Sequence, residues 1–157
     1  MVKLVGTDVI YVTRLPSRHL VSVDLVLGTR LPAYCTAPGR TILAHLPSQQ
    51  VDEILSNTQL VKYTRYTITD PADIRALLQD IRENGFGIQE QEFILGDISA
   101  AAPIFDGMGK PVAAINIAVP LSRWNVERLR KDLVPLIMET AQAISKTIAM
   151  SANGGQD

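Results

Sequence analysis

The chain has 157 residues, of which 46% are hydrophobic and 20% charged, which suits one globular domain with a sizeable core. Its formal net charge of −1 argues against a nucleic-acid surface spread over this domain. The single cysteine excludes an intrachain disulfide and is compatible with a reducing cytoplasm, the expected location. No apolar run reaches membrane-spanning length, the two histidines lack metal-ligand spacing, and no motif indicates a cofactor.

The first part of the chain is predicted to form strands. Runs of β-favouring residues at Val2–Val5 and Val9–Leu15 flank a short turn, which predicts a hairpin. Val21–Leu25 alternates apolar and polar residues, as a strand with one solvated face does. The stretch Leu31–Leu46, LPAYCTAPGRTILAHL, then passes from a strand end into a helix.

The start of that helix is the first candidate binding feature. Thr36 is predicted to cap it through the side-chain hydroxyl, and Pro38 occupies the first turn, where a missing N–H is tolerated. Free N–H groups at a helix N-terminus can hold a carboxylate or a phosphate. Arg40, in the same turn, adds a guanidinium suited to a carboxylate. An ordinary capped helix explains the same residues, so both interpretations stay open.

The middle of the chain alternates helices with one long connection. A short helix is predicted over Gln50–Ser56. Thr58–Thr69 is rich in Thr, Tyr and Arg without clear periodicity, and it is either a functional loop or a solvated connection. Asp70 is a predicted cap with Pro71 at the first helical position, and Gly85 ends the helix that follows.

Extended segments dominate the next part of the sequence. Phe86–Ile98 and Ser99–Phe105 are predicted to be extended, with Gly96 as a bulge or turn between them. The residues at 106–109 close a hairpin onto the strand Pro111–Val119. These neighbours, joined by short turns, indicate an antiparallel sheet.

The chain is predicted to end in a long helix. Asn125 caps a helix that runs from Val126 to about Met150, and Pro135 is expected to kink it because proline lacks an N–H. Residues 151–157 are predicted to be a disordered tail. The whole pattern predicts one α+β domain over residues 1–150, with helices on the faces of the sheet and room for a pocket between them.

The sequence contains no convincing catalytic group. Cys35 and His45 are ten residues apart across a strand–helix junction, and a small buried thiol is the favoured interpretation of the cysteine. Glu90 and Glu92 are predicted to share one face of a strand, where a solvated face is favoured over a catalytic carboxylate pair. The prediction is therefore a protein that is not an enzyme. A small enzyme and a ligand-free oligomerisation module remain the alternatives.

Two polar residues in apolar strands point to a pocket. Asn116 lies within VAAINIAV and needs a hydrogen-bond partner if it is buried. Ser99 is expected nearby across the hairpin. Together with the helix start they would form a polar corner in an apolar cavity, whereas the alternative is that both side chains satisfy the backbone.

A recognisable sequence pattern extends over nearly the whole chain. The stretches that carry it are GTDVIYVTRLPSR, SVDLVLGTRLPAYCTAPGRTILAHLP, TRYTITDPADIRALLQDIRENGFGIQEQEF and DISAAAPIFDGMGKPVAAINIAVPLSR. A signature runs through Gly85, Glu92, Ser99, Ala101, Ile104, Phe105 and Asp106. In these residues the chain resembles the C-terminal effector-binding domain of the IclR family of bacterial transcriptional regulators. It departs at Gln89, where the family usually has Asp or Ser, and at Ala100, where the family has an aliphatic residue.

The resemblance implies a fold and a function. The expected fold is GAF-like, a curved antiparallel sheet with a ligand cleft facing helices and loops. The sequence of the first half is most similar to the branch of the family that controls aromatic-acid breakdown through the β-ketoadipate pathway. Its effectors are small carboxylates: protocatechuate, 4-hydroxybenzoate, β-ketoadipate or cis,cis-muconate. Family members form dimers or tetramers and bind DNA through an N-terminal winged helix-turn-helix that this chain lacks.

The resemblance also implies site residues. The effector-binding positions that it implies are Ala37, Pro38, Gln89, Ser99, Asn116 and Ala118. Gly39 and Arg40 complete the helix-start part of the predicted site, Arg40 through a charge-assisted bond to the effector carboxylate. Arg40 could equally face solvent or a subunit interface. Tyr63, Arg65 and Tyr66 of the long connection are candidates for a lid.

Overall fold

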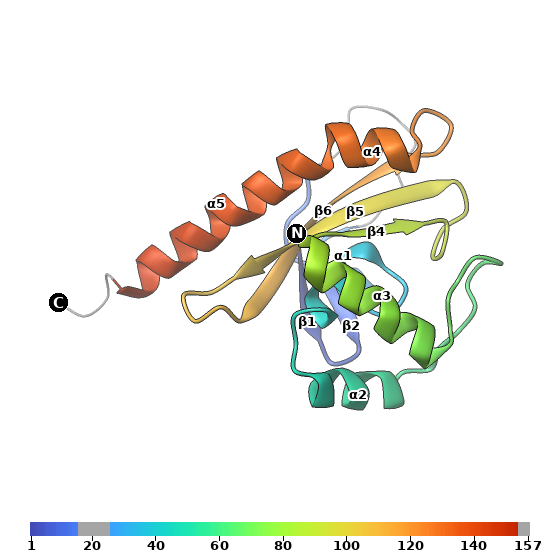
Figure 1. Cartoon of the computed structure of the whole chain (residues 1–157), viewed down its shortest axis with the longest axis horizontal. Coiled ribbons are helices and arrows are strands. Elements are labelled where there is room, and N and C mark those ends of the chain that lie inside the picture. Colours follow the sequence, from blue (N-terminus) through green and yellow to red (C-terminus); the bar gives the residue numbers. More distant parts are fainter. Residues whose placement is uncertain (16–25, 154–157) are drawn as a thin grey trace.

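The computed structural model describes residues 1–15 and 26–153, so the predicted strand Val21–Leu25 and tail residues 154–157 lie outside it. Within the described part, an antiparallel sheet curls into a half-barrel and carries helices on both faces (Figure 1). The predicted α+β class, with a curved antiparallel sheet and flanking helices, is confirmed.

The sheet has six strands in the order β3-β2-β1-β6-β5-β4. Their bounds are β1 Val2–Val5, β2 Asp8–Tyr11, β3 Arg30–Pro32, β4 Gly87–Glu90, β5 Asp97–Phe105 and β6 Pro111–Pro120. Both predicted hairpins form, β1 with β2 and β5 with β6. The predicted extended segment Phe86–Ile98 is not one strand, because an irregular loop over residues 91–96 separates β4 from β5. That loop is central to the site.

Five helices occupy the described part of the chain. They are α1 Ala37–Leu43, α2 Ser48–Ser56, α3 Pro71–Asn84, α4 Val126–Asp132 and α5 Val134–Asn153. α1, α2 and α3 lie on one side of the sheet, whereas α4 and α5 cross the other side, and α5 extends beyond the sheet toward the C-terminus (Figure 1). In the ranges 1–15 and 26–153, no helix combines the length and the apolarity needed to span a membrane.

Several helix ends follow the sequence signals. The Asp70 side chain accepts hydrogen bonds from two backbone N–H groups of the first turn of α3, and Gly85 ends that helix in a left-handed conformation at φ 78°. Asn125 caps α4 in the same way as Asp70 caps α3. The last predicted helix is not kinked at Pro135 but interrupted at Leu133, which separates α4 from α5. Residues 151–153 of the predicted disordered tail belong to α5.

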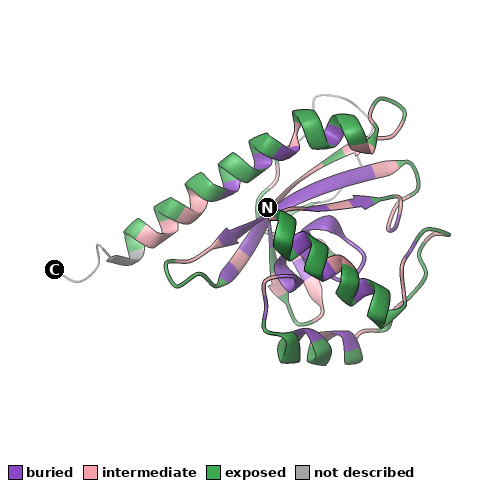
Figure 2. Cartoon of the chain, viewed as in Figure 1, coloured by how far each residue is buried: buried purple, intermediate pink, exposed green. Residues whose placement is uncertain are grey.

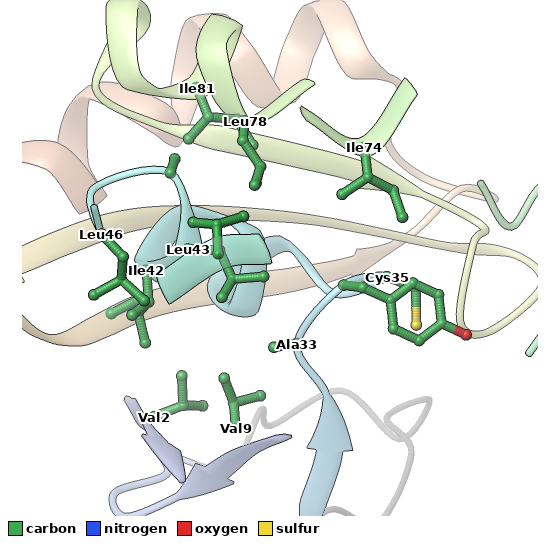
Figure 3. Packing of buried hydrophobic residues seen from close by; sticks show 14 of the residues in the cluster. Val2, Val9, Ala33, Cys35, Ile42, Leu43, Leu46, Ile74, Leu78 and Ile81 are labelled. Carbon is green, nitrogen blue, oxygen red and sulfur yellow. The ribbon is translucent and has the colours of Figure 1, made fainter. Parts of the chain in front are cut away.

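α1 is the buried centre of the first helical layer, and all seven of its residues are buried. α1 and the turn after it contribute Ile42, Leu43 and Leu46 to an apolar cluster. The same cluster contains Ile74, Leu78 and Ile81 from α3 and Val2 and Val9 from β1 and β2 (Figure 3). Gly39 permits this close packing, because a Cβ there would lie 2.3 Å from the carbonyl oxygen of Ala33. α1 is therefore fixed in place by the core.

β5 is buried on both faces (Figure 2). The residues that face α4 and α5 are apolar: Ile98, Ala100, Ala102 and Ile104 pack with Leu129, Val134, Ile137 and Ala141. Because side chains alternate along a strand, Asp97, Ser99 and Ala101 face the other side, toward α1. The same strand thus presents an apolar face to one helical layer and a partly polar face to the other.

Candidate functional site

A small cavity lies between the sheet and the start of α1. It is lined by Tyr11, Leu31, Thr36, Ala37, Pro38, Gln89, Phe93, Ile94, Asp97, Ser99, Asn116 and Ala118. Six of the predicted effector-binding residues are in that set: Ala37, Pro38, Gln89, Ser99, Asn116 and Ala118. The fold therefore brings together residues from three separate parts of the sequence.

Strand register explains how the sheet residues meet. Ser99 on β5 pairs with Gln89 on β4 and with Ala118 on β6, so the three form one row across the sheet. Asn116 belongs to the next row on the same face, opposite Ala101. Residues on one row and on alternate positions of a strand share a face, so the register places all four predicted sheet residues on the α1 side.

Asn116 has a side-chain partner from a distant strand. Its Nδ2 donates to the hydroxyl oxygen of Tyr11 on β2 at 3.2 Å. Burial raises the pKa of Tyr11, and the nearby Asp97 carboxylate raises it further, so the phenol stays protonated and can donate as well as accept. Asn116 is half-buried and has a hydrogen-bond partner, and Ser99, which was expected nearby across the hairpin, lies on the same face of the sheet.

Two polar groups of the cavity have no hydrogen-bond partner within residues 1–15 and 26–153. They are the hydroxyl of Ser99, a buried residue, and the carboxylate of the half-buried Asp97, and neither of these polar groups is completely closed off from solvent. Burial raises the pKa of Asp97 to about 6. Sequence reasoning missed both Asp97 and Tyr11. The available signal for Asp97 was its position two residues before Ser99, which puts both on one face.

The loop over residues 91–96 forms the outer wall of the cavity through Phe93 and Ile94. Gln89 anchors this loop when its amide oxygen is oriented toward it, where it accepts from the backbone N–H groups of Glu92 at 2.5 Å and Phe93 at 3.3 Å. The enclosed space is about 40 Å³, which suits a few water molecules. An aromatic ring needs more room than this, so binding of such a ligand requires part of the cavity wall to move.

Arg40 does not reach the cavity, which corrects its predicted role. Its Nη1 and Nη2 donate to the two carboxylate oxygens of Glu92 at 2.5 and 2.6 Å, and its Nε donates to the Tyr34 carbonyl at 2.5 Å. The side chains of Arg40 and Glu92 are 2% and 8% exposed. The guanidinium edge that could bind an effector carboxylate therefore binds a carboxylate of the protein itself, and Nε is used by a backbone carbonyl. Gly39 likewise serves packing and does not line the cavity.

Glu90 and Glu92 do not share one solvated face of a strand, so that prediction is wrong. β4 ends at Glu90, which is exposed, and Gln91 adopts φ 58°, which turns the chain so that Glu92 points inward. Besides the two bonds from Arg40, Glu92 Oε2 accepts from the Ile68 backbone N–H at 3.0 Å. Glu92 thus ties together α1, the loop 91–96 and the long connection before α3.

The predicted capping bond of Thr36 is also absent. Thr36 occupies the N-cap position of α1, but its hydroxyl donates to the Pro32 carbonyl at 2.8 Å instead of accepting from the helix. The hydroxyl fixes the entry of the chain into α1. The capping alternative fails because an acceptor in the preceding strand lies within reach.

The three lid candidates lie outside the cavity. The Tyr63 ring packs edge-on against Phe93, with 4.9 Å between ring centroids, so it supports a cavity wall from behind. Arg65 Nη2 donates to the Tyr66 hydroxyl at 2.8 Å, and both residues are exposed. Only Tyr63 is therefore in contact with that wall.

Cys35 and His45 do not form a catalytic pair. Burial raises the pKa of the Cys35 thiol to about 12, which removes the thiolate that nucleophilic attack needs. His45 Nδ1 lies 2.9 Å from the Thr41 carbonyl, and its ring packs against Phe105. The buried-thiol interpretation is confirmed. Within the described ranges, no group of three or more metal-ligating side chains occurs.

Comparison with known proteins agrees with the resemblance seen in the sequence. Residues 1–146 match the model of the C-terminal domain of the bacterial transcriptional regulator IclR. The chain is 34% identical over 143 residues to the Pca regulon regulatory protein of Pseudomonas putida, covering 90% of this chain and 49% of that protein. It is 38% identical over 120 residues to the Pca operon regulatory protein of Acinetobacter baylyi, covering 76% of this chain and 43% of that protein.

Solved structures give the same result. The inducer-binding domain of PobR from Acinetobacter, a double mutant in complex with 3-hydroxybenzoic acid, superposes with a TM-score of 0.83 at 28% identity, covering 92% of this chain and 85% of that one. IclR of Thermotoga maritima gives a TM-score of 0.88 at 27% identity, covering 94% of this chain and 59% of that one. The chain spans about half the length of the curated relatives it matches. These relatives are regulators and not enzymes, and the chain belongs to the IclR family of bacterial transcriptional regulators, of which it forms the C-terminal effector-binding domain.

Proposed function

We propose that this domain is the sensor for a small carboxylate, most specifically an aromatic hydroxy acid such as 4-hydroxybenzoate, 3-hydroxybenzoate or protocatechuate. The observation that carries the proposal is the cavity itself, in which six residues named from the resemblance surround one enclosed space. Two regulators with Pca names and a PobR domain bound to 3-hydroxybenzoic acid are among the similar proteins, which favours this ligand class.

The chemistry of the walls suits such a ligand. Leu31, Ala37 and Phe93 offer apolar surface to a ring. Ser99 and the Tyr11–Asn116 pair offer hydroxyl and amide groups that can donate to a carboxylate. The binding step is coupled to displacement of Phe93 or Ile94, because the unliganded space of about 40 Å³ is too small for a ring.

In the whole regulator the domain works in the cytoplasm as part of a dimer or tetramer. DNA is bound by an N-terminal winged helix-turn-helix in the parts of the relatives that this chain does not cover. The effector changes the geometry of the assembly through different affinities for its two arrangements, since a ligand with equal affinity for both shifts nothing. The movement of the loop over residues 91–96 is the first step of that change.

A thermal-shift screen tests the ligand class. Protocatechuate, 4-hydroxybenzoate, β-ketoadipate and muconate are added to the protein at increasing concentration, and we expect at least one acid to raise the Tm. A ligand at a hundredfold excess over its Kd stabilises the folded state by about 2.7 kcal/mol. If none of the four acids shifts the Tm, the proposed effector class is wrong.

Two variants test the site. Ser99→Leu and Asn116→Leu place apolar volume in the cavity, so we expect both proteins to fold but to lose the ligand-induced rise in Tm. Ser122→Leu is the matched control, because Ser122 is exposed and lies outside the cavity. An unchanged ligand response in both cavity variants would place the binding site elsewhere.

A further inference from the structure

We propose that Asp97 selects the effector by accepting a hydrogen bond from it, so that the site takes ring carboxylates that carry a hydroxyl or another N–H or O–H donor at the end that faces Asp97. This inference rests on the proposed function and adds to it which end of the ligand points where. It also assigns a role to an acidic residue in a site for acids, where a negative charge is otherwise unfavourable.

The position of Asp97 is set by the sheet. It is the first residue of β5, and it shares the α1 face with Ser99, two residues further along. Two residues of a strand span about 7 Å, a separation that one benzene ring with substituents at both ends bridges. A ligand whose carboxylate lies toward Ser99 and Asn116 therefore presents its far substituent to Asp97.

The Asp97 carboxylate is available to accept a hydrogen bond from a ligand. Its carboxylate has no hydrogen-bond partner within residues 1–15 and 26–153, although it is half-buried in the cavity wall. Glu92, five residues earlier, is different, because its carboxylate accepts three hydrogen bonds: each oxygen accepts from Arg40, and one also accepts from the Ile68 backbone N–H. A bound ligand would cut this half-buried carboxylate off from water, and a buried acceptor without a donor is unfavourable, so a ligand that supplies the donor gains affinity.

The expected ratio of affinities follows from the energies of hydrogen bonds to charged groups. A hydrogen bond to a charged acceptor contributes more than one between neutral groups, and a ligand lacking the donor leaves the buried carboxylate desolvated and unpaired. We expect a hydroxybenzoate to bind about 10-fold or more tightly than a ring carboxylate of similar size without a donor. Burial of Asp97 increases the difference, because water cannot replace the missing donor once the loop has closed.

Titration calorimetry on the full chain tests this selectivity. The probes are 4-hydroxybenzoate, 3-hydroxybenzoate and 4-fluorobenzoate, the last being of similar size but without a donor. The variants are Asp97→Leu, which removes the acceptor, and Asp97→Asn, which keeps one carbonyl acceptor without the charge. Asp80→Leu on the exposed surface of α3 is the matched control. Circular dichroism records whether each variant is folded.

The expected result is a ratio of affinities for hydroxybenzoate over 4-fluorobenzoate that falls to about 1 in Asp97→Leu, is intermediate in Asp97→Asn and is unchanged in Asp80→Leu. A folded Asp97→Leu protein that keeps the wild-type ratio overturns the inference. If Asp97→Leu does not fold, an unchanged ratio in Asp97→Asn overturns it. If no acid binds to the wild-type protein, the proposed function has failed at the ligand class, and that failure appears before any variant is measured.

Discussion

One carboxylate lies within the loop over residues 91–96 and another directly follows it, and their environments are opposite. Glu92 is buried against Arg40 with two short hydrogen bonds and accepts a third from the backbone of Ile68. Asp97 borders the cavity with no such partner in the described ranges, and burial raises its pKa to about 6. The same chemical group, a carboxylate, thus stabilises the structure at one end of the loop and is available for binding at the other.

The difference lies in what each carboxylate meets when the sheet and helices assemble. Glu92 meets a guanidinium carried by α1, and the pair connects the loop to the core on which α1 rests. Asp97 borders the open space of the cavity, and its charge raises the pKa of Tyr11, another residue of the cavity lining. A buried charge that has found its partner holds the fold together, whereas one without a partner is a group to which a ligand can bind.

Breaking the Glu92 side of the comparison should have the largest effect. Arg40→Met leaves Glu92 buried without its counter-charge, and we expect the free energy of unfolding to fall by about 3–5 kcal/mol. For a chain of this size the Tm falls by on the order of 10 °C, measured by calorimetry or circular dichroism. The double variant Arg40→Met with Glu92→Leu should recover part of the loss, since an apolar pair can replace a buried ion pair.

The control for this experiment is a second arginine–carboxylate pair. Arg75 and Asp52 are 2.8 Å apart, but their side chains are 48% and 55% exposed. Arg75→Met should lower stability by less than about 1 kcal/mol, because water screens and solvates exposed pairs. Equal losses for Arg40→Met and Arg75→Met would contradict the structural role assigned to the buried pair.

The Asp97 side of the comparison predicts a smaller, pH-dependent effect in the unliganded protein. Below about pH 3.8 the carboxyl is neutral in both states, and between 3.8 and about 6 the folded protein holds a proton that the unfolded chain releases. The protonated Asp97 carboxyl stabilises the folded state relative to the charged form. This contribution to the free energy of unfolding is fully present below about pH 3.8 and is lost as the pH rises through about 6. Asp97→Asn cannot become charged, so it should gain stability over the wild type between about pH 4 and pH 8.

The gain should be on the order of 1 kcal/mol, or about 2–4 °C in Tm, once solvent screening of a half-buried group is allowed for. Thermal melts of the wild type and of Asp97→Asn at several pH values provide the measurement. A difference in Tm that does not depend on pH would show that Asp97 is not held in a desolvated position.

Cys35 gives the smallest effect and extends the comparison to a third acid. The nearby Arg40 lowers the pKa of the thiol, but burial and the charge of Glu92 raise it, with a value of about 12. We expect a thiol reagent at about pH 8 to label the folded protein far more slowly than the protein in denaturant, because almost no thiolate is present. Rapid labelling of the folded protein would reopen a chemical role for this cysteine.

Local sequence signals predicted much of this molecule. The hairpins, the caps at Asp70 and Asn125, the end of α3 at Gly85 and the break near Pro135 depend on residues within one turn of each other. The predicted hairpin was enough to expect Ser99 near Asn116, and the family resemblance added the remaining cavity residues that were predicted. Such features need only neighbouring residues, so they can be derived without the fold.

Only the tertiary structure decided which residues that are far apart in the sequence come into contact. The guanidinium of Arg40 fits an effector carboxylate as well as it fits Glu92, 52 residues away, and nothing local distinguishes the two. Tyr11 meets Asn116 across 105 residues, and Asp97 becomes significant only because the loop before it closes one end of a cavity. The sequence by itself determined the family, most of the elements and half of the residues that line the cavity. The assembled fold decided which charged groups are paired and which one remains for a ligand, because desolvation and pairing depend on the whole surroundings of a group.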